Sequence, residues 1–192
     1  QYTGRHKFVV NTVIEMPFGR GRRYLTDIHP VIDGVLGGWK FVTISHFQSG
    51  QYFSPSYSGS DPSNTNSSGG LPDRNADGNL PADQRTVNGW FDWQAFARPP
   101  AGRFGNSGVN ILEGPGLNLH HLSIIKNFRI TERFDLELFL GISNLFNHPH
   151  FNYPRTDIVA SAPSVITSAR NSNQDQNKAG QRLMEGALKL SW

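Results

Sequence analysis

Long segments in which apolar and polar side chains alternate are the feature that most constrains the fold of this chain. In residues 134–145 (FDLELFLGISNL) the apolar side chains of one face are Phe134, Leu136, Leu138, Leu140 and Ile142. Successive side chains of a β-strand point to opposite faces of the sheet. The segment is therefore predicted to be a strand that is apolar on one side.

Residues 5–16, 119–130 and 182–192 alternate likewise, and residues 39–53 alternate less cleanly but are rich in β-branched and aromatic residues, so all four are predicted to be strands. Only the tripeptide TER at 131–133 separates 119–130 from 134–145, so these two strands are expected to form an antiparallel hairpin. The sequence thus predicts an all-β fold, an antiparallel sheet of about five long strands. A short helix is expected near residues 28–36.

The lengths of these strands favour a membrane over a soluble sheet. A tilted strand of about 9–11 residues spans the hydrocarbon layer, whereas strands of soluble proteins average about 5–6 residues. Only 36% of the residues are hydrophobic, and the mean hydropathy is -0.46. No apolar run approaches the roughly 20 residues of a membrane helix, but a β-barrel with alternating strands keeps hydropathy low. Lys126 interrupts one apolar face and is expected to extend its ammonium group toward an interface.

Charge and cysteine content exclude several classes of function. The formal net charge is +3, and the arginine-rich stretch 17–24 is typical of a solvated turn, so no nucleic-acid partner is expected. The chain has no cysteine, which excludes disulfides, zinc–thiolate sites and thiol nucleophiles.

Connection lengths give an orientation for a barrel, because outer-membrane barrels have short periplasmic turns and long external loops. If the chain ends at the periplasm, the long connections 54–118 and 146–180 are both external. The connections 17–38 and 131–133 are then periplasmic. Residues 1–192 are expected to form one partial barrel.

Several stretches resemble the carboxyl-terminal end of TonB-dependent outer-membrane receptors, especially Oar-like proteins with a carboxypeptidase-regulatory-like domain. They are MPFGRGRRYL (16–25), VLGGWKFVTISHFQSGQYFS (35–54), WFDWQAFARPPAGRFGNSGVNILEGPGLN (90–118), LSIIKNFRITERFDLELFLGISNLFNHPHF (122–151) and ALKLSW (187–192).

That resemblance implies a 22-stranded barrel with an N-terminal plug in the bacterial outer membrane, of which this chain holds about the last five strands. The chain would be unable to transport alone. Its partners would be the remaining barrel and plug and the outer-membrane lipid. The resemblance also implies that Leu188, Leu190 and Trp192 form the signal that the barrel-assembly machinery recognises.

The sharpest local motif is DRNADGNLPAD at 73–83. Asp73, Asn75 and Asp77, followed by a glycine, match the first half of an oxygen-rich calcium loop. The bidentate glutamate expected at the twelfth position is replaced by Gln84, with Asp83 one place earlier. The motif predicts either a calcium site that stiffens a loop or a polar external turn without metal.

An aromatic cluster lies in the same long connection and consists of Trp90, Phe91, Trp93 and Phe96. It is interpreted either as a ligand or glycan platform in an external loop or as a loop that packs on its neighbours. The adjacent His120 and His121 point to opposite faces of a strand and cannot chelate one ion together. No pattern of a catalytic triad is found. Asp135 and Glu137 share a strand face, but a paired-carboxylate site also needs a pocket, which the sequence does not indicate, so the chain is not expected to be an enzyme.

Two alternatives to a transporter segment remain open. Five strands cannot close a barrel, so an isolated chain would have two strand edges with unpaired backbone groups. Further copies could pair with these edges and form a ring, tube or filament, which would be extracellular if the chain is released. Strands 5–16 and 182–192 would point the same way, so head-to-tail copies would pair in parallel unless a further segment, such as 104–112, supplies a strand. A soluble ligand-binding β-domain is the other alternative, disfavoured because it would need a second sheet to cover the apolar face.

Overall fold

The computed structural model describes residues 4–131, 133–170 and 180–192. The chain divides into two compact units, each assembled from separated stretches. Unit 1 comprises Gln1–Lys7, Gln48–Leu117 and His150–Arg170, and unit 2 comprises Phe8–Phe47, Asn118–Pro149 and Asn171–Trp192. Each is described by itself below.

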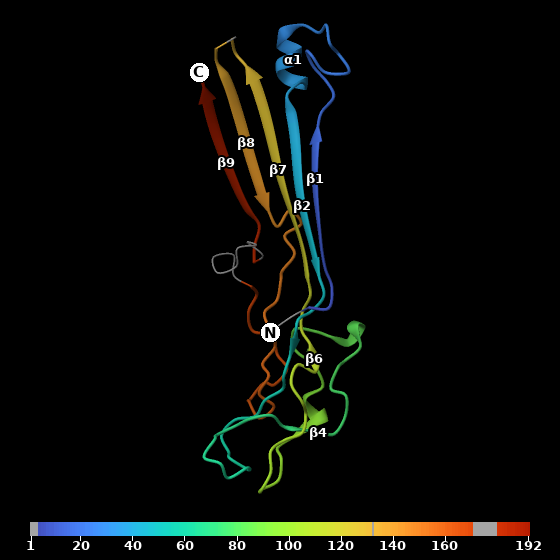
Figure 1. Cartoon of the computed structure of the whole chain (residues 1–192), viewed down its shortest axis with the longest axis vertical. Coiled ribbons are helices and arrows are strands. Elements are labelled where there is room, and N and C mark those ends of the chain that lie inside the picture. The colour runs from blue at the N-terminus through green and yellow to red at the C-terminus, as the bar shows by residue number, and fades with distance from the viewer. Residues whose placement is uncertain (1–3, 132, 171–179) are drawn as a thin grey trace. The chain divides into compact units, whose positions relative to one another are not determined.

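Unit 2 is built on a five-stranded sheet with the order β1-β2-β7-β8-β9. Its strands are β1 (Lys7–Glu15), β2 (Trp39–Gln48), β7 (Leu117–Arg129), β8 (Asp135–Ser143) and β9 (Leu183–Ser191). β8 pairs antiparallel with both β7 and β9, and the arrows of the five strands alternate in direction in Figure 1. The prediction of an antiparallel sheet of five long strands is confirmed.

The predicted helix is also present, as α1 (Pro30–Leu36). Proline at its start suits the first turn, where the missing N–H has no partner within the helix. The Nδ1 atom of His29 accepts a hydrogen bond from the Val31 N–H, and the Gly37 N–H donates to the Asp33 carbonyl at the other end. No helix in the described ranges is long and apolar enough to cross a membrane.

The strand expected over 39–53 is shorter than predicted. β2 ends at Gln48, and Tyr52–Phe53 forms a separate short strand, β3. Gly50 lies between them against the backbone of Gly114, where an added Cβ atom would be 1.8 Å from the Gly114 carbonyl oxygen. This close approach of two segments of the chain interrupts the alternation of side chains, and only glycine permits it.

Unit 1 shows that the two long connections fold together instead of remaining separate loops. β3 pairs with β6 (Leu112–Glu113), and β4 (Asp73–Arg74) pairs with β5 (Phe96–Ala97). Two short 3₁₀ helices, η1 (Ala82–Gln84) and η2 (Trp93–Ala95), complete the unit. The segment 104–112, considered as an extra sheet strand, contributes only its last residue to β6.

The core of unit 1 draws on both connections. Its buried members are Phe53, Tyr57, Phe91, Ala95, Phe96, Leu112 and Ile158. Leu112 has no exposed surface, and the Phe53 ring meets the Phe91 ring edge to face at a centroid distance of 5.7 Å. This mutual burial explains why polar, glycine-rich sequence adopts a defined structure here.

We expect Leu112→Ala to lower the free energy of unfolding of unit 1 by about 2–5 kcal/mol, because it leaves a cavity in a closed core. Val109→Ala, three residues away and 67% exposed, is the matched control and should change stability by less than about 0.5 kcal/mol. Denaturant titration followed by tryptophan fluorescence measures both. Equal effects of the two substitutions would contradict the assignment of this core.

Candidate membrane-facing surface and loop site

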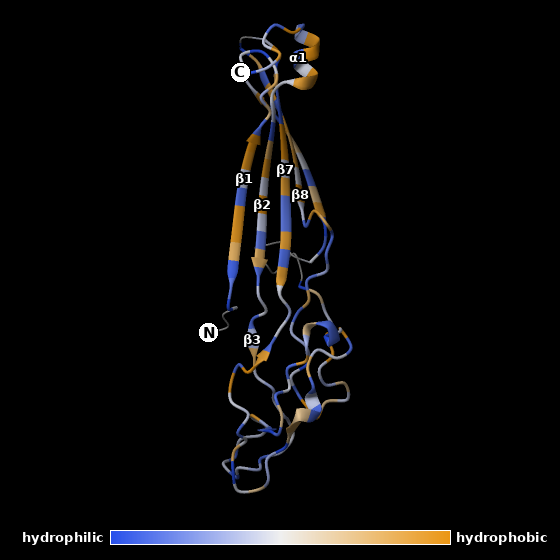
Figure 2. Ribbon diagram, turned by 90° about the vertical axis from the view of Figure 1, so that its right-hand side faces the viewer, coloured by the Kyte–Doolittle hydropathy of each residue, from blue (hydrophilic) through white to orange (hydrophobic). Residues whose placement is uncertain are grey.

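The register of the sheet gathers the apolar residues of β7, β8 and β9 on one face. Leu136 lies opposite Leu190, and Leu138 lies opposite Leu188. In the neighbouring pair of β7 and β8, Phe128 lies opposite Leu136 and Ile124 lies opposite Leu140, on the same face. Figure 2 shows the apolar and polar bands alternating along the strands.

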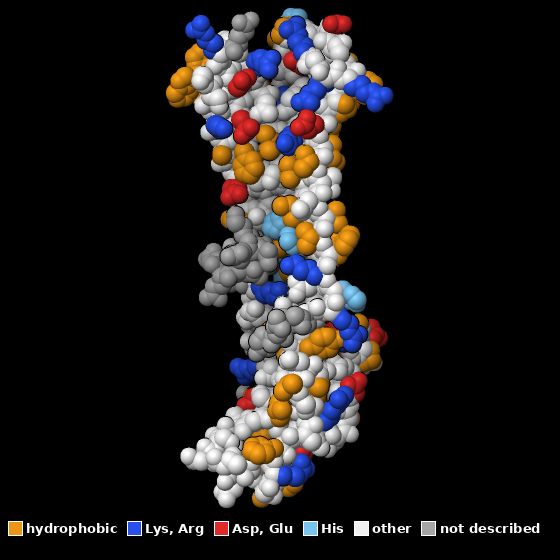
Figure 3. Space-filling model, viewed as in Figure 1, with side chains coloured by type: hydrophobic (Ala, Val, Ile, Leu, Met, Phe, Trp, Pro, Cys, Tyr) orange, Lys and Arg blue, Asp and Glu red, His pale blue; other side chains and the backbone are white. Residues whose placement is uncertain are grey.

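Protein does not cover much of this face. Leu188 is 70% exposed, Met184 58% and Leu190 50%. Contiguous apolar surface of this kind marks an interaction with lipid or with another protein. Figure 3 shows hydrophobic side chains spread across the sheet, with charged side chains gathered at the end that carries α1.

Aromatic side chains mark that same end of the face. The Trp39 and Phe41 rings stack at a centroid distance of 6.3 Å. The Lys126 ammonium lies 5.3 Å from the Trp39 ring centre and 4.7 Å from that of Phe128. Trp192, which follows β9, is 86% exposed.

A second aromatic row lies toward the other end of the strands. Phe8 and Phe47 have ring centroids 6.2 Å apart, and Phe47 meets His120 edge to face at 5.3 Å. His120 in turn meets Phe146 at 5.0 Å, and its Nδ1 atom is 2.8 Å from the Ser45 hydroxyl. Aromatic rows of this kind border both ends of the apolar band in outer-membrane barrels.

The separation of the two rows fits a bilayer. Trp39 and Phe47 both lie on β2, eight positions apart. At about 3.3 Å per residue this is roughly 26 Å along the strand. A tilt of about 40° reduces the height to roughly 20 Å, close to the apolar band of about 25 Å in outer-membrane barrels.

Lys126 is the exception on the apolar face, and the structure shows how it is accommodated. It is only 2% exposed, and its ammonium donates to the Gly37 carbonyl. The two aromatic rings beside it supply further cation–π attraction. The side chain thus extends to a protein acceptor beside α1, at the same end of the sheet as the aromatic row.

The opposite face of the sheet carries charged side chains together with apolar ones, such as Ile125 opposite Phe139. Glu137 lies opposite Lys189 in the β8–β9 register. The Lys40 ammonium is 3.9 Å from the Glu15 carboxylate, and the Arg129 guanidinium is 3.8 Å from Asp135. The ion pairs of this face suit a barrel wall that faces an aqueous interior.

The proposed assembly signal lies on the apolar face. Leu188 and Leu190 occupy alternate positions of β9 and are exposed, and Trp192 follows at the next alternate position. The geometry therefore presents the three side chains on one side of an edge strand. Their recognition by assembly machinery stays a prediction.

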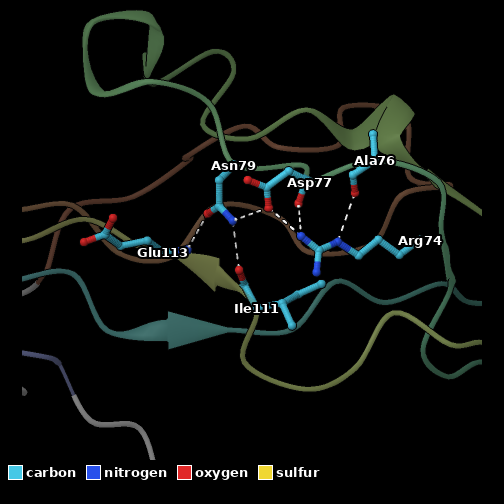
Figure 4. Close-up of polar contacts among 6 residues, drawn as sticks. All are labelled: Arg74, Ala76, Asp77, Asn79, Ile111 and Glu113. Atoms are coloured by element: carbon cyan, nitrogen blue, oxygen red, sulfur yellow. Dashed lines mark hydrogen bonds and ion pairs between the residues drawn. The ribbon is translucent and has the colours of Figure 1, made fainter.

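The predicted calcium loop encloses one of its own side chains. The Arg74 guanidinium donates to the carbonyls of Ala76 and Asp77 and to the Asp77 carboxylate (Figure 4). Asn79 donates to the same carboxylate at 3.2 Å and to the Ile111 carbonyl at 2.9 Å. A guanidinium therefore contacts several of the oxygens that a calcium ion would need.

The other predicted ligands are not brought together with Asp77. Asp73 accepts two hydrogen bonds from the Arg103 guanidinium, one of them at 2.8 Å. The Asn75 backbone N–H pairs with Ala95, and Asp83 lies in η1. Within the described ranges, no group of three or more His, Asp or Glu side chains is placed to hold a metal ion. Sequence reasoning missed the role of Arg74, although a cation at the second position of the motif was visible.

The four aromatic residues considered as a platform do not form one surface. Phe91 and Phe96 are 3% and 5% exposed and belong to the core of unit 1. Trp90 packs against that core, and its indole N–H donates to the Glu113 carbonyl at 2.8 Å. Only Trp93, at 40%, is exposed. Burial of Phe91 and Phe96 in the core therefore removes two of the four rings from the surface.

The serine-rich run after residue 54 is organised by an acidic side chain. The Ser63 hydroxyl donates to the Asp61 carboxylate at 2.7 Å. This hydrogen bond, and then those from the backbone of Thr65, Asn66 and Ser67, hold the pKa of Asp61 below its ordinary value. Local hydrogen bonds of this kind define turns in sequence that is otherwise polar.

Comparison with known proteins places this arrangement in a family. The family model described as outer membrane beta barrel domain matches residues 1–184. No curated protein and no solved structure matches the chain. The matched range includes four of the five strands completely and the beginning of β9. The chain therefore belongs to the outer membrane β-barrel domain family, and its place is the outer membrane.

Proposed function

We propose that the chain is the carboxyl-terminal barrel portion of a TonB-dependent outer-membrane transporter, without catalytic activity and unable to transport alone. The single observation that carries the membrane part of this proposal is the exposed apolar face bordered by two aromatic rows. The sequence resemblance described above supports the transporter part. The 22-stranded barrel and the plug belong to the same proposal.

The edges of the sheet support a need for further strands. β1 and β9 are the outer strands of the sheet, and each has one side without a partner strand within it. In a closed barrel, neighbouring strands of the parent protein would pair with both edges. The gene should therefore encode several hundred residues upstream, including a plug. An open reading frame that starts near Gln1 would refute this.

Self-assembly of the isolated chain is the second candidate, and the strand directions restrict its geometry. β1 and β9 run in the same direction (Figure 1), as follows from an odd number of alternating strands. Head-to-tail copies would therefore pair in parallel, whereas the pairs β7–β8 and β8–β9 are antiparallel. Antiparallel pairing requires two-fold contacts between like edges. Electron micrographs that show only dispersed particles would count against this candidate.

A charge on the apolar face tests the membrane assignment. We expect Leu188→Arg to destabilise the embedded protein by up to about 1 kcal/mol, because Leu188 is in register with Leu138 and Lys126 at the level of an aromatic row, and arginine on the lipid face costs less there than at the midplane. Ala187→Arg is the matched control, because residue 187 points to the opposite face. Heat-modifiable migration of the outer-membrane fraction on a gel measures folding. A folded band that is retained by Leu188→Arg and lost by Ala187→Arg would reverse the assignment of the two faces.

We propose that the loop 73–83 is a polar turn without metal in the wild type, in which the Arg74 guanidinium contacts the oxygens that a calcium ion would need. The Arg74 guanidinium already contacts the oxygens of this loop. We therefore expect calcium to leave the Tm of the wild type unchanged and to raise that of Arg74→Gln. Arg98→Gln, whose guanidinium instead contacts the Ser58 carbonyl, should stay insensitive. A calcium-dependent rise in the wild type would show that the ion displaces the guanidinium.

A further inference from the structure

The connection between β1 and β2 carries an unusual amount of exposed apolar surface for a turn expected in the aqueous periplasm. Tyr24 is 49% exposed and Leu25 46%. In α1, Val31, Ile32, Val35 and Leu36 are exposed by 69%, 48%, 64% and 45%. Figure 2 shows the apolar colour of α1. Such a concentration on one short segment calls for a partner surface.

The spacing of these residues gives α1 one apolar side. Positions 31, 32, 35 and 36 are related by steps of one and four, so they lie on the same side of a helix with 3.6 residues per turn. None of the residues of α1 is buried within the described structure. The helix is thus amphipathic, and the described residues leave its apolar side exposed.

The helix is fastened to the end of the sheet. The Trp39 indole N–H donates to the Val35 carbonyl at 2.8 Å, and the Lys126 ammonium donates to the Gly37 carbonyl. Trp39 is a member of the aromatic row at this end of the apolar face, and the Lys126 ammonium lies against the rings of Trp39 and Phe128. The apolar side of α1 is therefore tied directly to the row that marks one membrane interface.

The Asp33 carboxylate of α1 binds the earlier part of the connection between β1 and β2. The Asp33 side chain accepts a hydrogen bond from the Arg20 N–H at 2.8 Å. Gly19 and Gly37 both approach this carboxylate, where an added Cβ atom would be 2.5 Å and 2.6 Å from its Oδ1 atom. Glycine at these two positions allows the turn to close around Asp33.

Cationic side chains accompany the exposed apolar ones. The Arg22 guanidinium is 2.9 Å from the Glu15 carboxylate, and both side chains are about half exposed. The Arg23 guanidinium lies 5.4 Å from the centre of the Tyr24 ring. The Arg20 Nε atom donates to the Ile28 carbonyl. These arginines retain further N–H donors, which suit the phosphate groups of lipids.

We propose that α1, together with Arg20, Arg22 and Arg23, forms a membrane-surface anchor, in which α1 lies in the inner leaflet of the outer membrane. Val31, Ile32, Val35 and Leu36 enter the boundary between headgroups and acyl chains, and the arginines contact phosphate groups. The occupant is phospholipid, because the apolar side of α1 is joined to the lipid-facing row and cations accompany it. This inference rests on the proposed membrane-spanning role of the sheet.

The absence of cysteine from the sequence allows a direct test with single introduced cysteines. Val35→Cys, Asp27→Cys and Leu188→Cys each carry a nitroxide label in the full chain. The protein is reconstituted in vesicles of phosphatidylethanolamine and phosphatidylglycerol. Electron paramagnetic resonance then compares label collisions with oxygen, which concentrates in lipid, and with a water-soluble nickel chelate. Asp27 is the matched control, an exposed polar residue of the same connection.

We expect the ratio of oxygen to nickel collisions to be several-fold higher at residue 35 than at residue 27, and high at residue 188. A high ratio at 188 with a low ratio at 35 overturns the anchor and leaves the proposed function intact. A label at 35 that is shielded from both probes also overturns the anchor, because a protein then covers α1. A low ratio at 188 refutes the membrane-spanning sheet and, with it, the anchor.

Discussion

An apolar sheet face that the described residues leave largely exposed is the constraint on which the rest of the structure depends. Leu136, Leu138, Leu188 and Leu190 meet across β8 and β9, yet the two leucines of β9 remain largely exposed. Burying apolar surface is the main favourable term in folding. A bilayer supplies that burial for a single sheet, and the aromatic rows and the ion pairs of the reverse face then take their positions from it.

Strand identity and facing were predictable from the sequence because both follow from one local rule, the alternation of side chains. The end of β2 was not, because it depends on contact between Gly50 and Gly114, which are distant in sequence. The burial of Lys126 was equally hidden. Its acceptor is the carbonyl of Gly37, and backbone acceptors leave no signature in a sequence pattern.

The loop residues illustrate a different limit. Asp73 and Asp77 have the spacing of calcium ligands, but arginines contact both carboxylates. The aromatic cluster at 90–96 has the composition of a binding platform, but Phe91 and Phe96 complete a core that also includes Ile158. In each case the competing partner is a tertiary contact. Spacing alone indicates which chemistry a segment permits, and packing decides which of the permitted contacts forms.

The most direct test of the central claim is depth-resolved quenching of tryptophan fluorescence by brominated lipids in reconstituted vesicles. The chain has four tryptophans, so variants that retain only Trp39 or only Trp93 separate the sheet from the loops. The account predicts that bromines near the headgroups quench Trp39 and that no brominated lipid quenches Trp93. An unquenched Trp39 in folded, reconstituted protein would contradict the assignment of this face to the membrane.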